Sequence, residues 1–247
     1  MVVQEHAGWT LPHAWDLPVE EARAAQARLA GQVIPRTTFS PAALRSVAGV
    51  DVGFRSERAW AAVVVLSFPG LEPLDWALAE APVAFPYVPG LLAFREAPAV
   101  LRSLEKLGTW PDLFLFDAHG IAHPRRMGLA AHLGVILDWP SVGCAKSRLC
   151  GQAAVPGPAA GEWVPLLEGE ETIGAVLRTA EGKKPVYVSI GHRVDLPTAV
   201  EMVRACCARG QRLPETTRLA HRMAGSAETK VPPPGEPRSM QQDRRRA

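Results

Sequence analysis

Residues 113–126 read Leu113-Phe-Leu-Phe-Asp117-Ala-His-Gly-Ile-Ala-His-Pro-Arg-Arg126 and join an apolar run to a cluster of polar side chains. The four apolar residues at 113–116 predict a buried β-strand. Asp117 stands at the end of that strand, and two histidines and two adjacent arginines follow it. A carboxylate at a strand end is well placed to bind a metal ion, and arginines just beyond it are well placed to bind phosphate. The stretch therefore suggests metal-assisted chemistry on a nucleic-acid backbone.

Strands and helices are expected on both sides of this stretch, and their order indicates the fold class. Upstream, apolar segments predict strands at Ser46–Phe54, Ala59–Phe68 and Leu74–Phe85, and their short connections indicate an antiparallel meander. A helix that begins at Pro98 comes next, with a valine and leucines between positions 100 and 107 as its buried stripe. Downstream we expect helices at Arg126–Leu137 and Ala199–Arg209 and strands at Ser141–Ala145, Trp163–Leu167, Thr172–Thr179 and Val186–Ile190. This order predicts an α/β fold, a single domain with a mixed sheet flanked by helices.

The composition excludes several classes of protein. Hydrophobic residues make up 47% and charged residues 21% of the 247 residues, which is typical of a globular protein large enough to bury a core. The formal net charge is only +2, so a polyanionic partner must be bound by a local basic face. The sequence shows neither a signal peptide nor a membrane-spanning apolar stretch, so we expect a cytoplasmic protein without a membrane partner. The four cysteines have no metal-binding spacing and are expected to be reduced thiols that pack as small apolar residues.

The two ends of the chain differ from this central part. Pro18–Gln32 reads as an exposed amphipathic helix, so residues 1–32 are expected to form an N-terminal helical extension. Residues 225–247 contain Val231-Pro-Pro-Pro-Gly and Arg244-Arg-Arg, lack apolar periodicity, and predict a disordered tail.

Two aspartates stand in or at the end of separate apolar strands. Asp51 lies within Val47-Ala-Gly-Val-Asp-Val-Gly-Phe54, and Asp117 ends the strand at 113–116. For either residue alone, a buried arginine or a capped turn is as good a partner as a metal ion. Two such positions in one sheet favour a shared divalent cation with oxygen ligands, such as Mg²⁺. Glu96 either complements the start of the expected helix or completes this set of carboxylates.

Two further polar residues directly follow predicted strands. Lys146 comes after the strand at 141–145 and, taken alone, is expected to face solvent. His192, in Ser189-Ile-Gly-His192, suits a general acid or base, a metal ligand, or a polar residue satisfied at a strand end. Ligands gather at the carboxyl ends of strands in open α/β sheets, so the recurrence of such residues favours one shared site. The segment after Asp117 contains more polar side chains than a loop buried in the core would have. We expect these residues to line the site or a phosphate track: His119, His123, Arg125 and Arg126.

The segment Pro86-Tyr-Val-Pro-Gly90 predicts a stiff loop, because two prolines fix φ on either side of Tyr87. A tyrosine held in this way suits a wedge between bases or a stacking platform. The alternative is a ring that folds onto the surface of its own loop. The neighbouring carboxylates favour the wedge.

Together these segments resemble the endonuclease V family, repair nucleases that recognise deaminated bases. The matching motifs, between Val33 and Ala220, are Gly49-Val-Asp-Val52, Pro86-Tyr-Val-Pro-Gly-Leu-Leu-Ala-Phe-Arg-Glu96, the Asp117–Arg126 segment, Ala145-Lys-Ser147 and Ser189-Ile-Gly-His192. The resemblance implies a ribonuclease H-like fold with a mixed five-stranded sheet and a catalytic domain at residues 33–224. It also implies cleavage of DNA at the second phosphodiester on the 3′ side of deoxyinosine, which leaves a 3′-hydroxyl and a 5′-phosphate. Mg²⁺ is the implied cofactor, and Mn²⁺ is expected to substitute for it.

The resemblance also implies roles for individual residues. Asp51, Glu96 and Asp117 would bind the metal, and Lys146 and His192 would support catalysis. The loop at Tyr87 would act as the wedge that fills the gap left by a flipped base. A pocket for hypoxanthine would be lined by Pro89, Gly90, Leu92, Ala118, His119 and Gly120, while Arg125 and Arg126 would contact phosphate. A monomer is expected.

At one position the chain departs from the family pattern. The family has Asp-Gly-x-Gly, whereas this chain has Asp117-Ala118-His119-Gly120. The methyl group of Ala118 is expected to narrow the pocket and to alter base preference or turnover, without touching the metal ligands. Two alternatives stay open: cleavage of inosine-containing RNA, since no residue clearly discriminates the 2′-hydroxyl group, and a catalytically idle nucleic-acid-binding module. The presence of all three carboxylates argues against the idle module.

Overall fold

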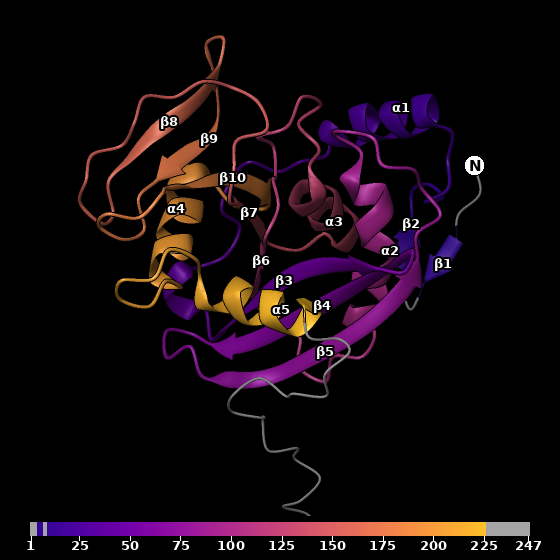
Figure 1. Cartoon of the computed structure of the whole chain (residues 1–247), viewed down its shortest axis with the longest axis horizontal. Helices are drawn as coiled ribbons and strands as arrows, with labels where there is room; N and C mark the ends of the chain where they lie inside the picture. The colour runs from indigo at the N-terminus through magenta and orange to yellow at the C-terminus, as the bar shows by residue number, and fades with distance from the viewer. Residues whose placement is uncertain (1–3, 7–8, 226–247) are drawn as a thin grey trace, which may run out of the picture.

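A mixed eight-stranded sheet forms the centre of the structure (Figure 1). The computed structural model describes residues 4–6 and 9–225. Its elements in chain order are β1 (Gln4–His6), β2 (Trp9–Leu11), α1 (Val19–Ala30), the short 3₁₀ helix η1 (Pro41–Ala43), β3 (Ser46–Arg55), β4 (Arg58–Ser67), β5 (Pro73–Pro82), α2 (Leu92–Leu104), β6 (Leu113–Phe116), α3 (Leu129–Leu137), β7 (Ser141–Ala145), β8 (Trp163–Glu168), β9 (Glu171–Leu177), β10 (Val186–His192), α4 (Leu196–Ala205) and α5 (Glu215–Gly225).

The strand order in the large sheet is β5-β4-β3-β6-β7-β10-β9-β8. β3 pairs in parallel with β6, and β6 pairs in parallel with β7. β3, β4 and β5 form an antiparallel meander, and β10, β9 and β8 continue the sheet with antiparallel pairs on the other side. The predicted α/β class, the meander and the mixed sheet flanked by helices are confirmed. The sheet has eight strands, whereas five were expected. The difference arises because β8 and β9 extend the sheet beyond β10.

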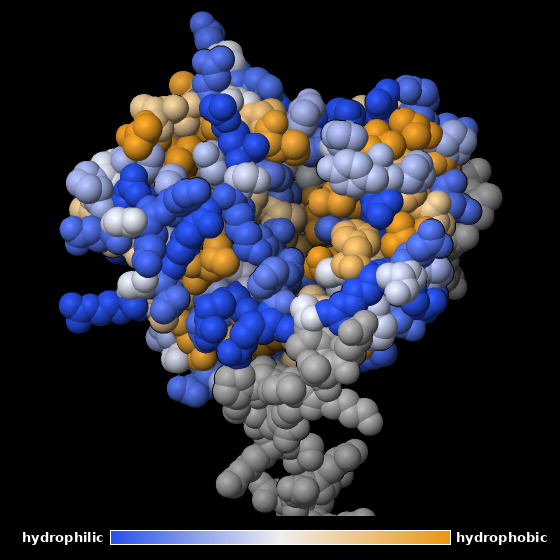
Figure 2. All heavy atoms as spheres, viewed as in Figure 1, coloured by the Kyte–Doolittle hydropathy of each residue, from blue (hydrophilic) through white to orange (hydrophobic). Residues whose placement is uncertain are grey.

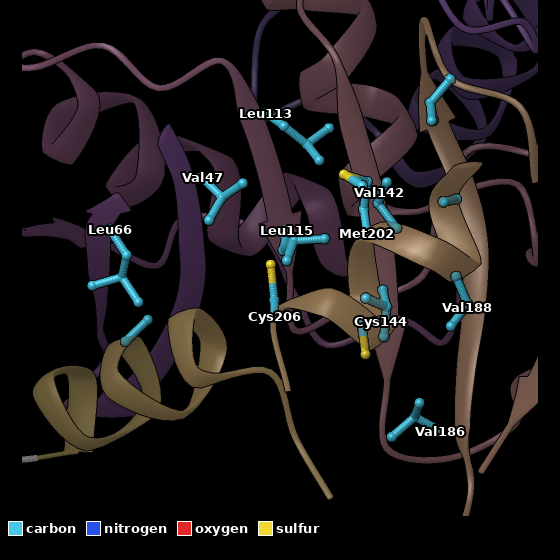
Figure 3. Packing of buried hydrophobic residues seen from close by; sticks show 14 of the residues in the cluster. Val47, Leu66, Leu113, Leu115, Val142, Cys144, Val186, Val188, Met202 and Cys206 are labelled. Atoms are coloured by element: carbon cyan, nitrogen blue, oxygen red, sulfur yellow. The ribbon is translucent and has the colours of Figure 1, made fainter. Parts of the chain in front are cut away.

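Two layers of helices cover the sheet, and each buries its own apolar cluster. The strand side chains of one face, including Val47, Leu115 and Val142, pack against α4 and α5 (Figure 3). Cys144 and Cys206 belong to this cluster as buried, unpaired thiols, as the sequence predicted. The opposite face packs against α2 and α3. Among the described residues, no helix has the length and apolar character needed to cross a membrane.

Helix α2 begins at Leu92, six positions before the predicted start at Pro98. Proline at the first helical position is common because its missing N–H is unpaired there in any helix. Here Pro98 lies inside the helix. The turn before it is stabilised by burial: Leu91 and Phe94 pack against Phe85 and the alanines of α1. As a result, Glu96 lies within the helix rather than before it.

Helix α5 has no counterpart among the predicted elements, which end at Arg209. It lies across β3 and β4 and buries Leu219, Ala220 and Met223 against the sheet (Figure 1). Its apolar stripe is thin and charged residues flank it, so the periodicity was weak in the sequence. The predicted tail at 225–247 lies outside the described residues, apart from Gly225 at the end of α5.

Gly49 allows α5 to approach β3 at backbone distance. A Cβ atom at Gly49 would lie 2.1 Å from the carbonyl carbon of Thr216 and 2.6 Å from the backbone nitrogen of Thr217. Both neighbours are backbone atoms, so no side-chain rotation relieves the overlap. Gly49 therefore fixes the start of α5 against the strand that carries Asp51.

We expect Gly49→Ala to displace α5 from β3 and to lower the free energy of unfolding by about 2 kcal/mol, a usual cost of overpacking. Urea denaturation followed by circular dichroism measures the loss. The matched control is Gly31→Ala, because a Cβ at Gly31 meets only the Arg28 carbonyl oxygen at 3.9 Å. Equal midpoints for the two variants would contradict the packing argument.

Candidate active site

Asp51 and Asp117 lie side by side where the parallel pairing of β3 with β6 ends: Asp51 is inside β3, and Asp117 directly follows β6. Val50 pairs with Phe116, so the next residue of each strand stands at the same level of the sheet. The backbone N–H of Asp117 donates to the Val50 carbonyl at 2.9 Å and holds this register. With side chains alternating along each strand, both carboxylates fall on the face covered by α5. The predicted convergence of these two aspartates is what the structure shows.

His221 joins the two aspartates from α5. Its Nδ1 lies 2.6 Å from Asp51 Oδ2, and one ligand atom each from Asp51, Asp117 and His221 lie within 4.8 Å of one another. The sequence reasoning missed His221 because it missed α5. The signal that was available is the helix start at Pro214-Glu215, followed by apolar residues at 219, 220 and 223.

Glu96 reaches this group from the opposite face of the sheet. It lies in α2, and its side chain is only 7% exposed. Burial and the negative charges of Asp51 and Asp117 raise the pKa of Glu96 to about 8. Burial and the charge of Asp117 likewise raise the pKa of Asp51. Asp51 and Asp117 are thus close enough to Glu96 for their charges to oppose its ionisation.

Lys146 supplies a positive charge at the same edge. It follows β7, the strand next to β6, and its Nζ forms an ion pair with Asp117 Oδ2. The structure therefore brings together four of the five residues predicted for catalysis: Asp51, Glu96, Asp117 and Lys146.

His192, the fifth residue, lies at the other edge of the sheet, so its predicted place in the site is wrong. β10 runs antiparallel to β7, and His192 pairs with Ser141 at the start of β7, whereas Lys146 follows the end of that strand. The four residue steps from Ser141 to Ala145 separate the two edges by roughly 13 Å. The His192 ring bonds to Asp138 at 3.0 Å and accepts the Ile34 N–H at 3.2 Å. The prediction for His192 requires β10 to run parallel to β7, because only parallel strands end at the same edge of a sheet.

A cavity of about 410 Å³ opens beside the carboxylates. Its size is within the range of small-molecule pockets. Figure 2 shows a hollow with apolar residues at its mouth between the lobe over α1 and α2 and the lobe over β8 and β9. Of the predicted pocket and wedge residues, those that line the cavity are Tyr87, Pro89, Gly90, Leu92, Ala118 and His119. Gly120 does not: its N–H donates to Ser189 Oγ at 2.9 Å, and it packs against β10.

Tyr87 projects from this loop. Its ring is 73% exposed, and the Arg95 guanidinium lies 5.9 Å from the ring centroid. The same guanidinium lies 5.0 Å from the centroid of the Phe54 ring. Tyr87 is therefore largely exposed and contacts the Arg95 guanidinium.

Arg125 and Arg126 have protein partners instead of the predicted open phosphate track. Arg126 forms ion pairs with Glu168 and Glu171, both at 2.6 Å. Arg125 donates to Gln26 Oε1 and to the Gly90 carbonyl. Arg126 thus ties the loop to the β8–β9 ribbon, and Arg125 braces the cavity wall. The predicted phosphate contact is not supported for either residue, because carboxylates and carbonyls already hold these guanidinium groups.

Comparison with known proteins gives a consistent result. A family model described as Endonuclease V matches residues 27–222. Endonuclease V of Roseiflexus castenholzii is 53% identical over 212 residues, which cover 86% of this chain and 94% of the relative. The crystal structure of endonuclease V from Streptomyces avermitilis superimposes with a TM-score of 0.83 at 44% identity and covers 88% of this chain and 96% of that one. Endonuclease V of Ciona intestinalis, in complex with a 24mer DNA containing an inosine followed by a ribo-adenosine, gives a TM-score of 0.73 at 27% identity and covers 87% and 99% of the two chains.

These relatives match the chain over most of its length, in sequence and in structure alike. The ribonuclease H-like architecture that the motifs implied is that of the matching structures. The acidic edge and the basic residue beside it lie inside the matched residues, as do all the residues that line the cavity except Gln26. The chain therefore belongs to the endonuclease V family.

Proposed function

We propose that the protein cuts DNA beside a deaminated base such as deoxyinosine, at the second phosphodiester on the 3′ side, and leaves a 3′-hydroxyl and a 5′-phosphate. As a member of its family it is an endonuclease, a hydrolase of phosphodiester bonds. The observation that supports the finer proposal is the position of the acidic edge directly beside a cavity large enough for a base.

The donor set at the acidic edge fits a divalent cation. Asp51 and Asp117 offer oxygen atoms within 4.8 Å of each other and of His221, and Glu96 lies close enough for its ionisation to be opposed by both aspartates. Carboxylate oxygens are the ligands that Mg²⁺ prefers, and Mn²⁺ also accepts an imidazole. Asp51, Asp117 and Glu96 would hold Mg²⁺, with Mn²⁺ as its substitute. When bound, such an ion polarises a phosphate and lowers the pKa of a water molecule.

Two basic residues at the edge have roles that their contacts suggest. Lys146 Nζ, which pairs with Asp117, can donate to a phosphate oxygen and stabilise negative charge that develops there. His221 donates from Nδ1 to Asp51 Oδ2, in the tautomer that leaves Nε2 unprotonated. That Nε2 can take a proton from the attacking water, while Asp51 stabilises the imidazolium ion that results.

The cavity is the proposed pocket for the flipped base, and Tyr87 is the proposed wedge. Extruding a base costs least where its pairing is weak, as it is for hypoxanthine. A tyrosine that is 73% exposed and contacts the Arg95 guanidinium can stack into the gap that the base leaves. The Ciona protein, a family member in complex with DNA that contains an inosine, supports inosine-containing DNA as the ligand.

A ribonucleotide strand is the second candidate substrate. The DNA of the Ciona complex carries a ribo-adenosine directly after the inosine. The cleavage assay should therefore compare two strands, one with deoxyadenosine and one with riboadenosine directly after the inosine.

Wild-type protein with Mg²⁺ is expected to cut an inosine-containing duplex once, at the second phosphodiester, and to stop cutting in EDTA. Asp51→Ala should abolish the product, because it removes a proposed metal ligand. A sequencing gel of end-labelled strands measures both results. Uncut DNA with folded wild-type protein would count against the function, and product from Asp51→Ala would reject the metal assignment.

The two histidines provide an internal control for the same assay. His221→Gln is expected to slow cleavage by 10²-fold or more, the range for a lost acid–base group. His192→Gln, at the other edge of the sheet, is expected to alter thermal stability while the cleavage rate of the folded fraction stays close to wild type. The reverse order of the two rates would restore His192 to the site and exclude His221.

Glu96→Gln is expected to stabilise the metal-free protein more at pH 8 than at pH 5. The unfolded chain releases the Glu96 proton near pH 4.5 and the folded protein near pH 8, so the wild type loses stability as the pH rises through this window. The gain of the variant should grow by on the order of 2 kcal/mol between the two pH values. Thermal unfolding in EDTA measures it, and exposed Glu21→Gln is the control. With saturating Mg²⁺ the wild type should become the more stable protein, and a pH-independent difference would contradict the clustering.

The methyl group of Ala118 is expected to restrict the pocket. Ala118→Gly should raise cleavage beside xanthine, which has one more exocyclic oxygen than hypoxanthine, by about tenfold relative to cleavage beside hypoxanthine. Ala118→Val should shift the ratio in the other direction. Single-turnover rates on the two substrates give the ratio, and an unchanged ratio in both variants would place the base elsewhere.

A further inference from the structure

Helix α1 contributes one side chain, Gln26, to the wall of the cavity. The matched family segment begins at residue 27, one position after it. We infer that Gln26 is a positioning residue for the proposed base pocket: it fixes the Arg125 guanidinium so that Arg125 and His123 hold the Gly90 carbonyl, and with it the loop that carries Tyr87. The inference rests on the proposed function for its consequence in cleavage, but its geometric part can be tested without DNA.

Gln26 is a buried polar side chain with both ends of its amide in use. It is 1% exposed. Its Oε1 accepts from Arg125 Nε at 2.6 Å, and its Nε2 donates to the Met127 carbonyl at 2.9 Å. The orientation of the amide is fixed, because an arginine Nε is only a donor and a carbonyl is only an acceptor. An apolar side chain of the same size would remove both bonds: the half-buried Arg125 would lose its anchor, and the carbonyl of the buried Met127 would lose the donor of Gln26.

The held Arg125 acts on Gly90 together with His123. Arg125 Nη2 donates to the Gly90 carbonyl at 2.7 Å, and His123 Nε2 lies 2.9 Å from the same oxygen. His123 Nδ1 accepts the Arg125 backbone N–H at 3.1 Å, so the ring proton is on Nε2 and is donated to Gly90. One carbonyl oxygen thus receives two bonds, and both depend on the segment that Gln26 anchors.

Gly90 is the point at which the loop turns. Its φ of +79° is one that only glycine adopts readily. A Cβ there would also lie 2.9 Å from Arg125 Nη2. The clamp, by which we mean Arg125 and His123 bonded to the Gly90 carbonyl, therefore contacts the glycine directly. Pro86 and Pro89 stiffen the loop internally, but they do not determine where it sits over the cavity. The two bonds to the Gly90 carbonyl hold the loop at its glycine, in addition to the packing of Phe85 and Leu91 against α1. Tyr87 lies three residues before this point.

The geometric part predicts faster backbone exchange in the loop when Gln26 is replaced. In the DNA-free protein, Gln26→Leu should raise the hydrogen-exchange rate of the Leu91 amide, which donates to the Val88 carbonyl at 2.9 Å inside the loop, about tenfold or more, as measured by mass spectrometry. Gln26→Glu keeps the acceptor for Arg125 and should restore most of the protection. Two controls are matched: Gln32→Leu makes the same change at an exposed position, and Val203→Ala costs stability in α4, remote from the loop.

The functional part is measured on the inosine duplex that the wild type cuts. Gln26→Leu should lower kcat/KM by about tenfold to a hundredfold, the usual cost of a misplaced group. In EDTA it should also reduce the fluorescence of a 2-aminopurine placed next to the inosine, which reports unstacking by the wedge. The double variant Gln26→Leu/Arg125→Met should have a kcat/KM close to that of Arg125→Met alone, because both substitutions remove the bond between Gln26 and Arg125.

Each outcome decides one part of the inference. Loop exchange that is unchanged in Gln26→Leu, or equally raised in Val203→Ala, overturns the positioning role. A wild-type protein that leaves inosine DNA uncut overturns the proposed function while the exchange result still stands. Faster exchange in the loop with wild-type kcat/KM shows that the clamp exists without serving cleavage, which overturns the functional part.

Discussion

Mutual repulsion among buried carboxylates is the constraint on which the architecture of this protein depends. Asp51 and Asp117 are neighbours across a parallel strand pair, and Glu96 faces them from a helix on the other side of the sheet. Burial, reinforced by the negative charges of the neighbouring carboxylates, raises the pKa values of Asp51 and Glu96. A fold that keeps such groups together must hold them on rigid elements. The backbone bond between Asp117 and Val50 and the layers of helices on both faces provide that rigidity.

The remaining parts of the site are held by contacts outside the acidic edge. Gly49 lets α5 lie against β3 at backbone distance, and this contact places His221 beside Asp51. Phe94, packed on α1 and Phe85, stabilises the turn of α2 that precedes Glu96. Gln26 and Arg125 connect α1 to the loop of Tyr87. The N-terminal helix, which looked like an appendage in the sequence, therefore contributes to the wall of the cavity. Each helix near the edge thus serves both the core and the site.

The sequence predicted the sheet more fully than it predicted the site. β6 and β7 have the predicted bounds, because each is a short apolar run whose two ends are marked by polar or turn-forming residues. The convergence of Asp51, Asp117 and Lys146 was predictable, because Asp51 interrupts an apolar strand and the other two directly follow strands that run parallel to it. His192 was misplaced because strand direction cannot be read from local pattern, and β10 runs the other way. His221 was missed because α5 gains its stability from packing on β3 and β4, which a thin apolar stripe does not reveal. The partners of Arg125 and Arg126 depend on chain segments up to 99 residues away, which no local motif encodes.

The position of α5 has a consequence for biosynthesis. Asp51 and His221 are 170 residues apart in the chain, and His221 lies on the last described helix. While the ribosome is still translating the segment before α5, the emerging polypeptide already contains the acidic pair and Lys146 but lacks the imidazole. The strand face that α5 covers is also bare at that stage. A growing chain therefore lacks, until α5 is made, both the helix that covers this face of the sheet and the imidazole that we propose as the general base.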